Sequence, residues 1–413
     1  MDAARADALA ARDRLARGGW IARDAESFRH LPPPPAAVWL GDGPEAPGCE
    51  AHPLAGAGWT LHPVGRTPQG RVDARWLDAA DAAQRAELFA GLPQPDDDDA
   101  APFAWAHRAL CRQGLRLRIG DEPGAGRSAG ETVWLQLRHQ PRSAVEAPLL
   151  VIDVQAGVHC VLVETHERAP LQCARSVVQN LQAHVHLGEG ATLQHLRIAR
   201  PGCSDRLAHH LSVRLARGAQ YHQALIAAGS AYHLQRNVVD LTAERSAARL
   251  AGVLFAAGST IEQQLRVSHR APHTASSIEG LALAGGAARA VLDAHTGIAE
   301  GCDEADVRQR LAGIPTGGQP KLVLRPHLEI LHDRVQAAHG ATWGALPDEA
   351  LFYVRQRGLD EARARALIIE GMAAAVLARG LGGPELLETL GVDALLCAAA
   401  SGHLAPAAQT CYG

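Results

Sequence analysis

Aromatic residues are scarce in this sequence, at 4% of 413 residues, although hydrophobic residues make up 47%. The core must therefore be built from Ala, Leu, Val and Ile rather than from aromatic packing. Charge of one sign is also lacking, because 40 basic residues stand against 44 acidic ones, for a net charge of −4. This balance argues against a protein-wide binding surface for nucleic acid or anionic lipid.

Several sequence motifs are missing as well. No apolar run approaches about 18 residues, and residues 1–20 mix acids and bases, so we expect neither a membrane span nor a secretory signal. The eight cysteines are scattered without a C-x-x-C pair, and we expect reduced thiols in a cytoplasmic protein. Walker A, nucleophile-elbow, H-E-x-x-H and dinucleotide-binding motifs are absent. Any ATP hydrolysis that the function requires must come from another subunit.

Three zones divide the chain, whose length suits two to three domains. Residues 1 to about 120 show Ala- and Arg-rich helical patterns joined by loops. From about 130 to 330, aliphatic residues fall on alternate positions, as in residues 181–187 and 211–215, which predicts short strands without helical crossovers. A sandwich, a barrel or a stacked β-solenoid fits this zone, and recurrent small residues at its turns favour the solenoid.

Helical patterns return after about residue 345. Pro347 and the acids that follow it begin one helix, which ends at Gly358, and Asp360 caps a second helix. Arginines give this pair the charge of a DNA-reading helix-turn-helix, but acidic residues are interspersed with them. We therefore expect a helix pair that docks a protein partner.

Histidine is abundant, with 21 residues, many of them in the strand zone. His184 and His186 would project from one face of a strand, and Glu189 follows them, which gives H-x-H-x-x-E. This pattern is one residue short of the metal-binding spacing of cupin-type barrels. Two interpretations stay open: solvated residues on the polar face of a strand, or the metal site of a metal-dependent β-solenoid or cupin-like enzyme.

The most specific motifs lie between residues 325 and 371. They read P-x-L-E-I at 326–330, D-x-V at 333–335, H-G-A-T-x-G at 339–344 and L-F-Y-x-x-x-R-G at 351–358. This segment resembles the C-terminal signature of the SufB/SufD family of iron–sulfur cluster assembly proteins. Weaker similarities extend the resemblance over most of the chain.

The resemblance implies a mainly β fold. A right-handed parallel β-helix would occupy residues 126–335, between an N-terminal helical domain at 1–125 and a C-terminal helical domain at 336–413. Within the family the chain is more similar to SufD than to SufB, since SufB proteins are longer and carry a cysteine-bearing C-terminal region. Here no cysteine lies between Cys302 and Cys397.

Resemblance to SufD implies protein partners rather than catalysis. Such subunits pair with SufB through their β-helix cores, and their C-terminal helices bind the ABC ATPase SufC. We therefore expect a non-enzymatic assembly subunit without nucleic-acid or membrane contacts, which could form a homodimer when SufB is absent. No tightly bound cofactor is expected, only iron or an iron–sulfur cluster held transiently at the interface with SufB.

The resemblance also assigns individual residues. His339 is the implied ligand of iron or a nascent cluster at the SufB interface, a role that suits an imidazole beside thiolates; an interface or turn histidine held by backbone hydrogen bonds is the alternative. Many relatives have a cysteine where this chain has Ala337, so groups of SufB would have to complete the ligand set. For SufC docking we expect residues of the helix pair, namely Phe352, Tyr353, Arg357, Leu367 and Ile368, with the core of the helical hairpin as the alternative place for Phe352.

Overall fold

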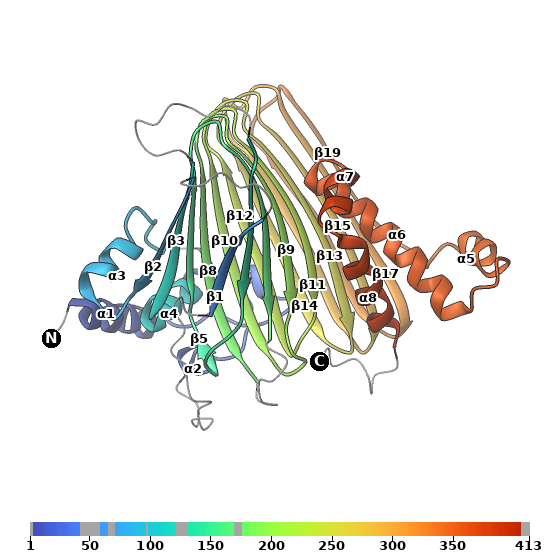
Figure 1. Ribbon diagram of the computed structural model, residues 1–413, viewed down its shortest axis with the longest axis horizontal. Helices are drawn as coiled ribbons and strands as arrows, with labels where there is room; N and C mark the ends of the chain where they lie inside the picture. Colours follow the sequence, from blue (N-terminus) through green and yellow to red (C-terminus); the bar gives the residue numbers. More distant parts are fainter. Residues whose placement is uncertain are drawn as a thin grey trace.

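Two sheets form the body of the protein (Figure 1). The computed structural model describes residues 3–41, 58–64, 71–95, 98–120, 131–168 and 176–405. Sheet A has the strand order β1 (Trp59–Pro63), β4 (Val133–His139), β7 (His159–Glu167), β9 (Thr192–Arg200), β11 (Gln220–Ala228), β13 (Ala247–Ala257), β15 (Ala275–Gly286), β17 (Ala305–Gly318) and β19 (Val335–Trp343). Sheet B has the order β18 (Lys321–Ile330), β16 (Arg289–Ile298), β14 (Thr260–His269), β12 (Tyr232–Leu241), β10 (Arg206–Leu215), β8 (Val178–Leu187), β6 (Leu149–Val154), β3 (Gln113–Ile119) and β2 (Val72–Asp78), and β5 (Val145–Glu146) also pairs with β8.

Consecutive strands from β6 onward fall in alternate sheets, and each pairs in parallel with the strand two places later in the chain. Each coil thus adds one strand to each sheet, which is a parallel β-helix, and the prediction of a mainly β solenoid is confirmed. Aliphatic side chains from alternate positions of both sheets fill its interior, among them Leu181, Val185 and Leu193. Gly190 and Gly218 occupy equivalent turns with φ of 64° and 65°, a left-handed conformation that favours glycine.

The N-terminal helices cover the outer face of sheet B. They are α1 (Ala3–Gly18), the short 3-10 helix Glu26–Phe28, α2 (Ala36–Leu40), α3 (Ala82–Leu88) and α4 (Ala101–Leu110). Much of the chain's small aromatic content gathers here: the rings of Trp39 and Phe103 lie 5.0 Å apart, edge to face, and both pack with Leu234 of sheet B. Aromatic packing therefore joins the helices to the solenoid, whereas aliphatic packing fills the solenoid itself.

The C-terminal helices lie at the other end of the body, and all but the first of them cover the outer face of sheet A (Figure 1). They are α5 (Asp348–Arg355), α6 (Glu361–Leu381), α7 (Pro384–Thr389) and α8 (Val392–Leu404). The predicted helix pair is confirmed as α5 and α6, and the side chain of Asp360 caps α6 by accepting from the Arg363 N–H at 2.8 Å. The terminal helices that the resemblance implied are thus present on both sides of the strands.

The N-terminal zone differs from the expectation of helices and loops alone. Strands β1, β2 and β3 lie in it, and β1 and β2 pair antiparallel with β4 and β3. Their strand state depends on partners far along the chain, which local periodicity does not show. The domain division stays a prediction: its first boundary, near residue 126, lies outside the described residues, and its second falls where β19 begins.

Two further expectations concern cysteines and membranes. The cysteines within the described residues are free thiols, as expected: Cys111, Cys160, Cys203, Cys302 and Cys397. Cys49, Cys173 and Cys411 lie outside the described residues. Among the helices of the described residues, none is both long enough and apolar enough to span a membrane.

One part of the solenoid interior is polar. The Glu164 carboxylate accepts hydrogen bonds from His166 and from His195 Nε2, the latter at 2.8 Å, and Arg197 Nε lies 3.7 Å away. Tyr221 is hydrogen-bonded to the other ring nitrogen of His195 at 3.1 Å. Burial alone would raise the pKa of Glu164, but the charge of Arg197 and the two histidine bonds hold it well below its ordinary value. We call these five residues the lumen cluster.

Buried histidines surround the lumen cluster. His209 and His233 are fully buried in sheet B, and burial lowers the pKa of His233 to about 4 and that of His209 well below 6.5. Both rings are hydrogen-bonded to the side chain of Gln235. At neutral pH these imidazoles are uncharged. They resist protonation in the folded state, but they become readily protonated once the chain unfolds.

We expect the free energy of unfolding to fall as pH drops from about 6.5 toward 4, because the unfolded chain then binds protons at histidines that stay neutral when folded. One such histidine gives a slope of at most about 1.4 kcal/mol per pH unit. His233→Gln should make the slope shallower, by up to that amount, in urea unfolding at pH 7, 6 and 5. Val239→Ala on the same strand should lower stability by about 2 kcal/mol at each pH without changing the slope, and equal slopes in His233→Gln and the wild type would contradict this prediction.

Candidate functional site

The last coil of the β-helix is open. Strands β18 and β19 end their two sheets, and within the described residues no strand pairs with their outer edges. Large apolar side chains lie exposed there: Trp343 is 70% exposed, Leu331 60% and Ile330 43%. An exposed strand edge with apolar neighbours is a surface that favours pairing with another chain. We call residues 321–343 the open coil.

His339 stands at the centre of this surface. In β19 it pairs in register with Gln309 of β17, and paired positions of a parallel sheet share a face. Gln309 is buried, and its amide donates to Thr296 Oγ1 at 2.8 Å and to the His327 carbonyl at 3.1 Å. The exposed side chain of His339 therefore continues an interior column and lies at the mouth of the solenoid.

The backbone beside His339 can pair with a further strand. The Gly344 N–H donates to the Gly313 carbonyl of β17 at 3.3 Å. Because the backbone groups of alternate residues face the same neighbour in a parallel ladder, those of Thr342 also face β17. The N–H and C=O groups of His339 and Ala341 then face the open edge. One imidazole and a free strand edge are thus presented together.

A single imidazole cannot hold a metal ion by itself. Within the described parts of the chain, no three His, Cys, Asp or Glu side chains converge as a metal site. Backbone groups of the described residues make no hydrogen bond to the His339 ring, so the alternative of a backbone-held histidine is not seen within this chain. Iron or a cluster at the open coil would need further ligands from a partner.

The H-x-H-x-x-E motif does not assemble into a ligand set. His184 and His186 share a face of β8, as predicted, but His186 Nδ1 is hydrogen-bonded to Asp153 at 3.1 Å. His184 is largely buried, and burial together with the charge of His186 lowers its pKa to about 4. Glu189 lies in the turn after β8 and is exposed. Metal binding by these three residues stays a prediction, and no geometric feature supports it.

The residues expected to dock SufC lie mostly on the surface. Phe352 and Tyr353 of α5 are 66% and 61% exposed, so the alternative of a hairpin-core position for Phe352 is wrong. The guanidinium of Arg357 stacks over the Tyr353 ring at 3.7 Å from its centroid. Leu367 is exposed as well, whereas Ile368 packs partly against the core beneath α6. In Figure 1, α5 projects from the body at its far end.

The sequence of this chain matches a known protein family. A family model described as SUF system FeS cluster assembly, SufBD core domain, matches residues 137–372. The chain belongs to the SufBD family. The matched range contains most of the strands of the β-helix, the open coil with His339, and α5. Membership confirms the resemblance to the SufB/SufD family that the motifs at 326–358 indicated.

Individual SufBD relatives match the chain at low identity and over only part of its length. A SufBD family protein of Synechocystis is 24% identical over 245 residues, covering 57% of this chain and 54% of the relative. A Mycobacterium tuberculosis SufBD family protein is 35% identical over 156 residues, 35% of this chain and 38% of its own. The SufD protein of Escherichia coli is 24% identical over 248 residues, 55% of this chain and 58% of its own. The chain thus spans between about a third and three fifths of these relatives' lengths.

The close packing of α6 on sheet A was not predicted from the sequence. A Cβ atom on Gly380 would lie 2.4 Å from Ala251 Cβ and 2.6 Å from the Gln223 carbonyl oxygen, so only glycine allows α6 this close to sheet A. Gly371 of the same helix has no atom within 4 Å of its Cβ position. The sequence offers one signal, a glycine in the interior of a helix. Gly371 and Gly380 both show it, so the sequence does not tell which of them contacts the sheet.

These two glycines form a matched pair for experiment. Gly380→Ala should lower the free energy of unfolding by about 2 kcal/mol, because the added methyl group pushes α6 off sheet A. Gly371→Ala should raise it by up to about 1 kcal/mol, since alanine is the better helix former and meets nothing. Urea unfolding of both variants measures the difference. Equal effects of the two substitutions would show that α6 is not held this closely.

Proposed function

We propose that this chain is the SufD-like subunit of an iron–sulfur cluster assembly complex, and that it pairs through its open coil with a SufB-like paralogue. The observation that carries the proposal is the conjunction of a free strand edge, exposed apolar side chains and one imidazole in residues 321–343. Membership of the SufBD family supports it, as does similarity to a protein named SufD. A second copy of this chain could occupy the same edge when the paralogue is absent.

The proposed role is structural and not catalytic. Iron or a nascent cluster is the cargo, bound transiently by His339 together with groups of the partner, because Ala337 offers no thiolate. A cytoplasmic location belongs to the proposal and suits the free thiols described above. The near-neutral net charge of −4 suits a protein whose partners are other proteins.

An ATPase of the SufC type would dock on the C-terminal helices. The exposed aromatic pair of Phe352 and Tyr353, with Arg357 stacked on Tyr353, has the composition of an interface hot spot. Nucleotide-driven movement of the ATPase could then pull on α5 and α6 and shift the paired coils, which is a two-state coupling. SufC capture that is unchanged in a Phe352→Ala, Tyr353→Ala double variant would contradict this part of the proposal.

Pairing through the strand edge is tested with Ala341→Pro. The proline removes an N–H that faces the open edge, so the chain's own pairing with β17 should survive while partner affinity falls by about 100-fold. Ala341→Val keeps the N–H and should pair as the wild type does. The complex is measured by size-exclusion chromatography with light scattering, on the chain co-expressed with its SufB-like paralogue. Normal pairing by Ala341→Pro would contradict pairing through the strand edge.

Cluster binding is tested with His339→Ala. The complex should form normally, but iron content and cluster absorbance after reconstitution should fall several-fold, because an imidazole ligand is lost. His339→Cys should restore part of the signal, since thiolate is the usual cluster ligand. Gln336→Ala on the outer face of the same strand is the control. Wild-type cluster yield in His339→Ala with an intact complex would refute the ligand role.

A further inference from the structure

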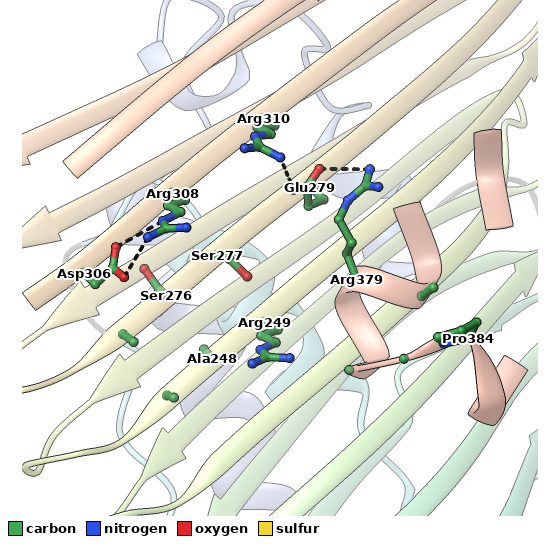
Figure 2. Close-up of a pocket in the computed structure, with 15 residues that line it drawn as sticks. Ala248, Arg249, Ser276, Ser277, Glu279, Asp306, Arg308, Arg310, Arg379 and Pro384 are labelled. Carbon is green, nitrogen blue, oxygen red and sulfur yellow. Dashed lines mark hydrogen bonds and ion pairs between the residues drawn. The ribbon is translucent and has the colours of Figure 1, made fainter. Parts of the chain in front are cut away.

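A groove lies on the outer face of sheet A, apart from the open coil. It has a volume of about 580 Å³ and runs between β13, β15 and β17 on one side and the junction of α6 and α7 on the other. Small residues such as Ala247, Ala275 and Gly383 line it and make it concave. Four arginines and two acids supply its charges (Figure 2). A cavity of this size suits a small molecule.

The strand register sets two of the arginines on either side of a serine. Arg249 of β13 pairs with Ser277 of β15, and Ser277 pairs with Arg308 of β17. Paired residues of adjacent strands share a face, and strands lie about 4.8 Å apart, so the two arginines stand about 10 Å apart at their Cα atoms. Figure 2 shows Ser277 between them. An anion above Ser277 could reach both guanidinium groups.

The groove carries an excess of positive charge. Arg379 and Arg310 both pair with Glu279, at 3.3 and 3.7 Å, and Arg308 pairs with Asp306 at 3.3 Å. Within the described residues Arg249 makes no ion pair or hydrogen bond. Four cations stand against these two carboxylates, and the carboxylate of Glu385 reaches the rim, where its Oε2 lies 2.5 Å from the Cβ position of Gly383, so the excess of positive charge is between one and two.

Two neighbours of Arg249 carry no full negative charge. His222 pairs with it in register from β11, and burial together with the charge of Arg249 lowers the pKa of His222 to about 4, so this ring is neutral at pH 7. The C-terminal end of α6 attracts cations through its dipole, and Arg249 Nη1 lies 3.7 Å from the Cβ position of Gly382 there. No carbonyl of that end accepts a hydrogen bond from Arg249 within the described residues, so its donors remain open to a ligand.

We propose that this groove binds a small phosphate-bearing molecule, with a phosphate group above Ser277 between Arg249 and Arg308. Guanidinium groups hold phosphate through paired, charge-assisted hydrogen bonds, and the serine hydroxyl can donate a third bond. A phosphate group, with one to two negative charges, would match this excess of positive charge. The site lies on the outer face of β17, one strand from the open edge of β19, and the proposal does not depend on the proposed function.

Isothermal titration of the full chain with pyrophosphate at low salt tests the proposal. We expect one saturable site whose affinity falls as salt is added. Arg249→Ala and Arg308→Ala should each weaken binding about tenfold, and Asp306→Asn should strengthen it about threefold by removing a competing charge. Arg270→Ala is the control, because Arg270 is exposed and pairs with Asp240 of sheet B. All four positions lie at the surface, and thermal unfolding verifies that each variant is folded.

Three results would overturn the proposal. The first is pyrophosphate binding that does not saturate or that is equal in the wild type and both arginine variants. The second is an Arg249→Ala variant with a lower unfolding temperature but unchanged binding, which would assign Arg249 to the end of α6. The third is a polyglutamate peptide that binds more tightly than pyrophosphate with the same arginine dependence, which would make the groove a protein contact.

Discussion

Each coil of this protein rests on the coil beside it through parallel, in-register pairing, and every site described above depends on that register. His195, Gln223, Gln309 and His339 belong to one column that runs through sheet A. A slip of one residue would turn every side chain of a strand to the opposite face. His339 would leave the mouth of the interior, and the guanidinium of Arg308 would be buried. The position of each functional group is therefore a property of the stack and not of its own strand.

The lumen cluster shows how polar groups become part of this constraint. Glu164 and Arg197 are both buried, and an unpaired charge there would cost several kcal/mol. The Glu164–Arg197 ion pair and the bond from His195 form only when β7 and β9 keep their register, whereas His166 lies on β7 beside Glu164. The aliphatic layers of the interior are less selective, because Leu and Val tolerate exchange. Polar contacts thus specify an alignment that hydrophobic packing alone would leave less defined.

Local periodicity predicted those elements whose state depends on their own residues. The strand patterns at 181–187 and 211–215 fall within β8 and β10, and Asp360 caps α6 as its position indicated. The shared face of His184 and His186 also followed from alternation. By contrast, β1 and β2 take their state from distant partners, and Arg249, Ser277 and Arg308 meet only because their strands stack. The sequence alone does not show which residues of successive coils are in register, since the coils differ in length. His339 was found through family resemblance, and its place at the open end required the structure.

The order of the coils also gives the open coil a place in time. In a stacked solenoid each coil contacts mainly its neighbours, so folding can spread from one coil to the next while the chain emerges from the ribosome. Residues 321–343 are the last coil to be made, and α6 must return to β11 and β13 after they have emerged. The open edge is therefore completed late, when the coils behind it are already stacked. A nascent chain thus exposes this unpaired, apolar edge only after the other coils have been made.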